Sequence, residues 1–385
     1  MAPPRDTAPL VLPSRKIPNF KSTFAIPEFC YLEYTKMPFA LTIPELLRRQ
    51  SNWCEQLNSP LYAKLLAQAA ENYENRGPLF DLLQPHATDD ESSVLPLRLM
   101  GAVHGLVLEK KAPDLAAFYP SAGGHPSPEA WPAFLRTIET HTADLGSLIH
   151  RPVQTNEVGR SGSLLCGFGL IAARTKLPLR LLEIGASAGL NLRWDRYRYE
   201  WQSSAWGDPA SPVRFQDAFV GNAPKIPPSI EIASRAGCDL SPIDATSAEG
   251  RLTLLSYVWA DQIDRIQLLD AAIGIATTIP CVIEKASAAD WLVTELAAPA
   301  AGVATVVFHS VVWQYIPAQE QERIVAIIEE AGRRASAQSP LAWLKMEPSE
   351  KRAEVRLRIY PGFEDRAIAT TRPHAPSVHW LLPRE

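Results

Sequence analysis

Cysteines and long apolar runs are both scarce in this sequence. Its five cysteines lie far apart, and none forms a Cys-x-x-Cys pair or stands beside a histidine. We therefore expect neither a disulfide framework nor a metal site, and we expect a reducing compartment. No apolar run reaches the ~18 residues that a membrane-spanning helix needs, and the N-terminus lacks the pattern of a signal peptide. These absences predict a soluble, cytoplasmic protein with no membrane partner.

An excess of positive charge is missing as well. The chain carries 38 Lys and Arg residues against 42 Asp and Glu residues, which gives a formal net charge of −4 at pH 7. Domains that bind nucleic acid are usually basic, so we expect no nucleic-acid partner. What is present is an ordinary globular composition, with 46% hydrophobic residues among 385. That length suffices for about two domains with cores of their own, and the composition carries no signal for the oligomeric state.

Three regions differ in their residue patterns. Residues 1–36 are rich in proline and show no sustained period, which predicts a disordered arm. Residues 37–150 show helix signals: Thr42 and Glu45 have the spacing of a capping box, and the pair Ser59-Pro60 is typical of a helix start. We expect this second region to be a helical domain that caps the third.

The third region, residues 151–385, alternates strand and helix patterns. We expect helices over 154–175 and from 188 onward, and strands over 179–184, 230–240, 280–286, 302–313 and 341–347. This alternation predicts an α/β domain with a mainly parallel sheet and helices on both faces. The last two predicted strands, 354–362 and 377–382, leave no room for a helix between them, so they should form an antiparallel hairpin at one edge.

The segment Leu-Leu-Glu-Ile-Gly-Ala-Ser-Ala-Gly at 181–189 runs from the first of these strands into a string of small residues. Gly185 permits a turn with positive φ, and Gly189 lets the next segment approach the sheet or a ligand closely. Open α/β sheets bind ligands in the crevice at the carboxyl ends of their parallel strands. A tight turn that serves packing alone is the alternative interpretation.

The pattern Glu-x-Gly-x-Ser-x-Gly resembles motif I of class I S-adenosylmethionine-dependent methyltransferases, with Ser187 at the middle glycine. The likeness covers roughly residues 150–385 and implies a Rossmann-like methyltransferase sheet. Longer segments, among them QTNEVGRSGSLL, WGDPASPV, YVWADQIDR and VVFHSVVWQYIP, resemble the bacterial family catalogued as domain of unknown function 2332. That second resemblance spans most of the chain after Met37 and implies kinship but no reaction.

The methyltransferase resemblance implies a cofactor, S-adenosylmethionine, and a set of residues that bind it. Asp239, with Asp244 in reserve, would bind the ribose hydroxyls at the end of the second strand; its alternative role is a turn cap. Ser287 stands where many such enzymes have an acid for the adenine amino group, which is a departure from the pattern. The implied cofactor-binding set is Glu183, Gly185, Ala186, Ser187, Gly189, Asn191, Asp239, Ser287, Asn156 and Arg160.

Two further groups of residues complete the predicted site. Asn156, Glu157 and Arg160 fall at near-helical spacing and could face the crevice, where Arg160 could clamp a carboxylate with two hydrogen bonds. The alternative for this group is an internal ion pair between Glu157 and Arg160. At the end of the fourth strand, His309 is the candidate general base and Ser310 would orient the methyl acceptor; a buried, hydrogen-bonded histidine is the alternative.

We therefore expect an S-adenosylmethionine-dependent methyltransferase-like protein that acts on a small molecule. Two other functions stay open. Gly-Ala-Ser-Ala-Gly at 185–189 formally matches the Gly-x-Ser-x-Gly signature of serine hydrolases, with His309 or His379 as base and Asp244 or Asp261 as acid. The third possibility is a non-catalytic binding or interaction module that keeps the fold.

Overall fold

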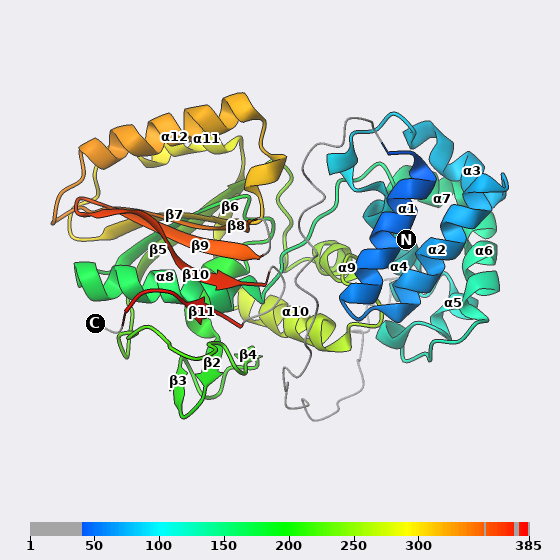
Figure 1. The fold of residues 1–385 in the computed structure, drawn as a ribbon, viewed down its shortest axis with the longest axis horizontal. Coiled ribbons are helices and arrows are strands. Elements are labelled where there is room, and N and C mark those ends of the chain that lie inside the picture. Colours follow the sequence, from blue (N-terminus) through cyan, green and yellow to red (C-terminus); the bar gives the residue numbers. More distant parts are fainter. Residues whose placement is uncertain (1–40, 350–351, 373–376, 384–385) are drawn as a thin grey trace, which may run out of the picture.

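The computed structural model describes residues 41–349, 352–372 and 377–383, so the arm predicted over 1–36 lies outside the described residues. The described chain forms two lobes that lie side by side: one is helical, and the other has a sheet between layers of helices (Figure 1). This arrangement confirms the expected mixed α/β architecture with a helical N-terminal region.

The helical lobe is built from residues 43–148. Its α-helices are α1 (Ile43–Gln56), α2 (Pro60–Glu74), α3 (Pro78–Leu83), α4 (Leu95–Leu108), α5 (Pro113–Ala116), α6 (Ala130–Thr140) and α7 (Thr142–Leu148), with 3-10 turns at η2 (Gln84–His86), η3 (Glu91–Ser93) and η4 (Pro120–Ala122). Helix α1 begins with the capping box predicted from Thr42 and Glu45. The apolar core of this lobe also takes in Trp259 and Ala260, which come from the sheet lobe.

The sheet has eight strands in the order β11-β10-β9-β8-β7-β1-β5-β6. Five are mutually parallel: β1 (Leu179–Ile184), β5 (Ile232–Asp239), β6 (Val282–Lys285), β7 (Ala304–Ser310) and β8 (Leu341–Pro348). The other three pair antiparallel at one edge: β9 (Ala353–Tyr360), β10 (Phe363–Thr371) and β11 (His379–Trp380). The mainly parallel sheet with an antiparallel edge was expected, but β10 makes that edge one strand larger than the predicted hairpin.

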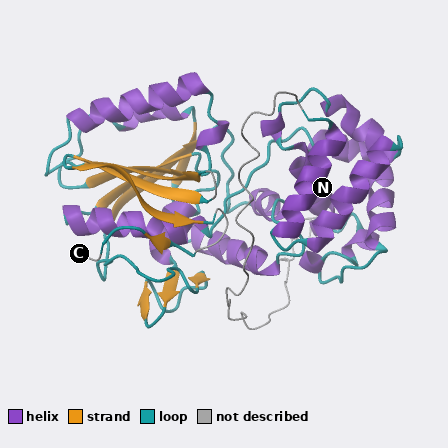
Figure 2. Ribbon diagram, viewed as in Figure 1, coloured by secondary structure: helices purple, strands orange, loops and turns teal. Residues whose placement is uncertain are grey.

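Helices cover both faces of the sheet (Figure 2). Helices α8 (Arg160–Thr175) and α10 (Ile263–Ala276) pack into the core on one face, and α11 (Ala288–Glu295) and α12 (Ala318–Arg333) pack on the other. Helix α9 (Ala248–Ser256) contacts α4 of the helical lobe, and a last 3-10 turn, η6 (Trp313–Tyr315), follows β7. All seven residues of β7 are buried, as expected of a central strand that is covered on both sides.

Two predicted helices differ from the structure. Helix α8 starts at Arg160 rather than at 154, so Asn156 and Glu157 precede it and the helical spacing assumed for them does not apply. After β1 the chain forms no α-helix but the short 3-10 segment η5 (Asn191–Arg196). The glycine turn therefore does not lead into the predicted α-helix.

An aromatic insertion follows η5. It forms a small sheet of β2 (Arg198–Trp201), β3 (Ser204–Trp206) and β4 (Arg214–Phe215). Tyr197, Tyr199 and Phe215 are buried in the core of the sheet lobe. These aromatic side chains thus extend the core and do not line an open mouth.

In the part of the chain that the structure describes, no helix is long and apolar enough to cross a membrane. Within those same residues, no three His, Cys, Asp or Glu side chains gather in a way that could hold a metal ion.

Candidate functional site

The parallel strands reverse their direction of connection at β1. From β1 the chain continues to β5 and β6 on one side, and it later returns to place β7 and β8 on the other. Such a reversal leaves a crevice beyond the carboxyl ends of the strands. The segment that leads from the helical lobe into α8 crosses this crevice, because Ser187 Oγ donates to Gln154 Oε1 (2.9 Å) and the Leu190 N–H donates to Asn156 Oδ1 (2.8 Å).

The glycine turn at 185–189 is tightly packed. Gly185 and Gly189 have φ of +65° and +67°. A Cβ at position 185 would lie 2.5 Å from Val312 Cγ2, and one at position 189 would lie 2.7 Å from Ile283 Cδ1. Packing and backbone conformation together therefore account for both glycines. Ser187 also has a positive φ, +52°, which is uncommon for a residue with a side chain.

Asp239 lies against this turn, as the sheet order predicted. Its Oδ2 accepts from the Ser187 N–H (2.9 Å) and its Oδ1 accepts from the Ser241 N–H (2.8 Å). The side chain is partly exposed, and each carboxylate oxygen can accept a second hydrogen bond. Asp239 is thus both the turn cap of the alternative interpretation and a carboxylate with capacity left for a ligand.

Glu183 and Arg160 are buried at the same edge of the sheet, and both have an unsatisfied polar atom. Glu183 is 2% exposed and its Oε2 has no partner among the described residues. Burial raises the pKa of its carboxyl well above 4.5, and the charge of Arg160 opposes that rise. Arg160 donates from Nη1 to Ser310 O (2.9 Å), whereas its Nε is buried without a partner. An unpaired buried polar group costs roughly 1–3 kcal/mol, so both atoms are expected to meet a ligand or water.

The predicted ion pair between Glu157 and Arg160 does not form. Glu157 instead pairs with Arg265 of α10. Arg160 has no carboxylate partner in the described part of the chain, and it does not form an ion pair with Glu183. Among the described residues, the Arg160 guanidinium is therefore hydrogen-bonded to a backbone carbonyl alone.

The two residues predicted to be catalytic point to opposite faces of the sheet. Side chains alternate along a strand, and Phe308 packs in the core under α8 while Val307 packs in the core under α11 and α12. His309 accordingly lies with Trp313 on the α12 face, where the two rings stack at 5.0 Å. Ser310 lies on the α8 face, near Arg160. The structure therefore does not bring His309 into one group with Glu183.

His309 instead belongs to a clamp that the sequence did not reveal. Its Nδ1 is 2.5 Å from Glu347 Oε1. The same carboxylate accepts from the Val312 N–H (3.2 Å) and the Trp313 N–H (3.3 Å). Glu347 thus holds the turn after β7 in place, and within that turn the side chain of Val312 packs against Gly185. His309 Nε2 is buried and has no partner among the described residues.

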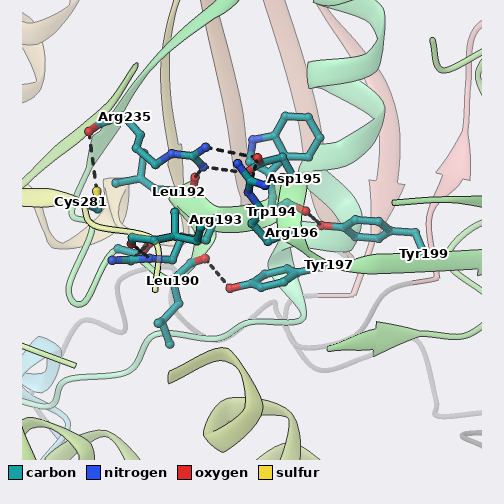
Figure 3. A network of polar contacts seen from close by, with 12 residues as sticks. Leu190, Leu192, Arg193, Trp194, Asp195, Arg196, Tyr197, Tyr199, Arg235 and Cys281 are labelled. Atoms are coloured by element: carbon teal, nitrogen blue, oxygen red, sulfur yellow. Dashed lines mark hydrogen bonds and ion pairs between the residues drawn. The ribbon is translucent and has the colours of Figure 1, made fainter. Parts of the chain in front are cut away.

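Side-chain hydrogen bonds hold segment η5 in addition to its own backbone hydrogen bonds. Tyr197 Oη donates to Leu190 O (2.6 Å), and Arg235 donates to Leu192 O (2.8 Å) (Figure 3). Arg193 donates to Gly189 O (2.7 Å) and to Ile279 O (2.9 Å). These side-chain donors add to the 3-10 hydrogen bonds of the segment, such as the one from the Arg193 N–H to Leu190 O (3.1 Å). Burial lowers the pKa of Arg193, whose cation sits directly beneath the glycine turn.

The remaining predicted residues have local partners. Ser287 caps α11, since its side chain accepts from the Asp290 N–H (3.3 Å). Asn191 is buried and its Oδ1 accepts from Ser161 Oγ (2.6 Å). Ala186 is buried against Gly237 of β5, where a Cβ would approach it to 2.7 Å. These contacts support the crevice and do not themselves indicate a ligand.

The groups proposed for a serine hydrolase do not assemble. Ser187 Oγ donates to an amide oxygen, which is not a base. His379 lies in β11, five strand spacings from β1, or about 24 Å at ~4.8 Å per strand. Asp244 binds Thr246, and Asp261 accepts from Ser59 Oγ and from the Leu61 N–H at the start of α2. His379 is therefore wrong as the base, and neither aspartate is hydrogen-bonded to His309.

An open pocket of about 430 Å³ lies away from the crevice. It is found where the small sheet meets the start of β5, and Trp206 and Asp195 are among its lining residues. Asp195 is already paired with Arg235 (2.6 Å), and Trp206 Nε1 donates to Pro227 O (2.8 Å). Among the residues that line this pocket, no buried side chain has an unsatisfied polar atom, in contrast to Glu183 and Arg160.

Three site residues had no signal in the sequence that could be read alone. Glu347 ends a predicted strand, Gln154 stands in a segment predicted to be helical, and the sequence does not distinguish Arg193 from the surface arginines.

A family model described as "Uncharacterized protein conserved in bacteria (DUF2332)" matches residues 44–380. No curated protein matches the chain.

Proposed function

The chain belongs to the bacterial DUF2332 family, whose description names no reaction, and we propose from the site that it is an S-adenosylmethionine-dependent methyltransferase-like protein acting on a small molecule. The observation that carries the proposal is the contact between Asp239 and the Ser187 amide. It brings an acid at the end of the second strand against the glycine turn of the first. A ribose bound there would meet a carboxylate that can accept from both of its hydroxyls.

The strand order supports the same proposal. β6-β5-β1-β7-β8 has the connectivity 3-2-1-4-5, the order found in doubly wound sheets that bind nucleotides at the switch point. In this proposal the ligand enters from the side of the helical lobe, next to Gln154 and Asn156. The rate would come chiefly from holding the acceptor in line with the methyl–sulfur bond. The acceptor would lie near Ser310, at the carboxyl end of β7.

Calorimetry with S-adenosylmethionine and S-adenosylhomocysteine tests the proposal. We expect micromolar binding to the wild type and a loss of at least tenfold in Asp239→Asn, because an amide can accept from only one of the two hydroxyls. Asp208→Asn is the matched control, since Asp208 also accepts from the N–H two residues on (Ala210, 2.8 Å) but lies in the loop between β3 and β4. Absence of binding by both nucleosides would refute the proposal.

A serine hydrolase is the second candidate, and one observation favours it. Ser187 has a left-handed φ of +52° three residues after the end of β1, and a strained turn after a strand carries the nucleophile in α/β hydrolases. Covalent labelling of Ser187 by a fluorophosphonate, lost in Ser187→Ala, would support this candidate. A protein that neither binds the nucleosides nor reacts with the probe would instead be the non-catalytic module.

A further inference from the structure

The guanidinium of Arg160 is held at one corner and free along one edge. Nη1 donates to Ser310 O (2.9 Å), which fixes the group at the carboxyl end of β7. Among the described residues that is its one side-chain hydrogen bond, so Nε and Nη2 are left without partners. These two nitrogens point their N–H groups in parallel along one edge of the planar group. Two parallel donors of this kind match the two oxygens of a carboxylate.

The surroundings of Arg160 do not supply that carboxylate. The side chain is 9% exposed and its Nε is buried. Glu157, three residues before it, is committed to Arg265, and Glu183 makes no ion pair with it. Glu183 carries an unpaired buried oxygen of its own on the same face of the sheet. The two unsatisfied groups come from different elements, α8 and β1, and both lie on the α8 face of the sheet near the carboxyl ends of β1 and β7.

We propose that Arg160 is a carboxylate-binding residue, which receives a ligand carboxylate on its Nε–Nη2 edge while Ser310 O holds Nη1. Glu183 completes the subsite as a second polar contact to the same end of the ligand. The carboxylate can come from the methionine part of the cofactor or from the methyl acceptor. The inference rests on the proposed function for the identity of the ligand. That the ligand carries a carboxylate is inferred from Arg160 and does not depend on the proposed function.

Two nucleosides distinguish these sources. S-adenosylhomocysteine carries the carboxylate, whereas 5′-methylthioadenosine has the same nucleoside without it. If Arg160 binds the cofactor, Arg160→Gln weakens S-adenosylhomocysteine at least tenfold in calorimetry and leaves 5′-methylthioadenosine unchanged. If Arg160 binds the acceptor, both nucleosides keep their affinity, and benzoate or succinate raises the thermal midpoint of the wild type but not of Arg160→Gln.

Two variants keep the test free of folding artefacts. Arg160→Lys retains the charge but has no pair of parallel donors, so we expect a loss of carboxylate affinity between those of the wild type and Arg160→Gln. Arg180→Gln removes another guanidinium of the same lobe, one that lies near the start of β1 and is paired with Glu295, and should leave nucleoside and carboxylate binding as in the wild type.

The outcomes separate this inference from the proposed function. Arg160-dependent protection by a simple carboxylate, without binding of either nucleoside, supports the inference and refutes the methyltransferase. Equal affinity of wild type and Arg160→Gln for S-adenosylhomocysteine, together with no Arg160-dependent effect of benzoate or succinate, overturns the inference. The same holds if no nucleoside and no carboxylate binds at all.

Discussion

Replacing Gly185 by alanine tests whether the glycine turn is fixed by packing. At φ +65° an L-residue costs about 1–2 kcal/mol more than glycine. The new Cβ would lie 2.5 Å from Val312 Cγ2, and relieving such an overlap typically costs about 1–3 kcal/mol. Together these effects predict that Gly185→Ala lowers the free energy of unfolding by roughly 2–5 kcal/mol.

The two contributions can be separated with a double-mutant cycle. Val312→Ala alone removes two methyl groups from a half-buried side chain and should cost about 1 kcal/mol. In the double variant the 2.5 Å overlap is relieved, leaving a contact of 3.1 Å with the Cβ of residue 312, while the backbone penalty stays. The double variant should therefore be more stable than the sum of the single effects predicts, by about 1–3 kcal/mol.

Urea unfolding at constant m-value measures each corner of the cycle. Gly274→Ala in α10 is the control, because nothing lies within 4 Å of a Cβ there and a helical glycine-to-alanine change should stabilise by up to ~1 kcal/mol. A loss below about 1 kcal/mol in Gly185→Ala, or strict additivity with Val312→Ala, would refute this account of the turn.

Three other variants test neighbouring features. The pKa of Glu183 is raised well above 4.5 in the fold, so the native state binds this proton more tightly than the unfolded state does. The wild type therefore loses stability as the pH rises from about 4.5 toward the raised pKa. Glu183→Gln should remove this part of the pH dependence of the unfolding free energy, measured with urea from pH 4 to 8, and an unchanged pH dependence would contradict the prediction. Trp259→Ala should cost about 3–5 kcal/mol and speed amide exchange in α2 and α4, whereas unchanged exchange there would show that Trp259 is not needed by the helical core. Glu347→Ala should expose the amides of Val312 and Trp313 to faster hydrogen exchange, and full protection would argue against the clamp.

The sheet was predictable because its signals are local. Apolar runs ended by glycine or a polar residue mark β1, β5, β7 and β8, and Thr42 with Glu45 marks the start of α1. The absence of the predicted helix after β1 could not be foreseen from the sequence. It depends on the side chains of Arg193 and Asp195, which bind partners far away in the chain, Ile279 and Arg235. β10 was missed since its charged start, residues 364–366, interrupts the apolar alternation of a strand.

In the candidate site, too, some features could be predicted from the sequence and others could not. Asp239 could be placed near the glycine turn, since the order of parallel strands brings their carboxyl ends together. The contact of His309 with Glu347 could not be foreseen, because it depends on the register in which His309 pairs with Lys345, two residues before that carboxylate. The face on which His309 points follows from the strand alternation, which places it opposite Ser310.

The insertion of Trp259 and Ala260 into the helical core ties the order of folding to the order of synthesis. Helices α1 to α7 emerge first, yet their core stays unfilled until roughly a hundred further residues have been translated. At ~5–20 residues per second this takes on the order of 5–20 s. During that interval the nascent helices expose the apolar surface that Trp259 and Ala260 later cover, and their core is completed only when the loop between α9 and α10 arrives.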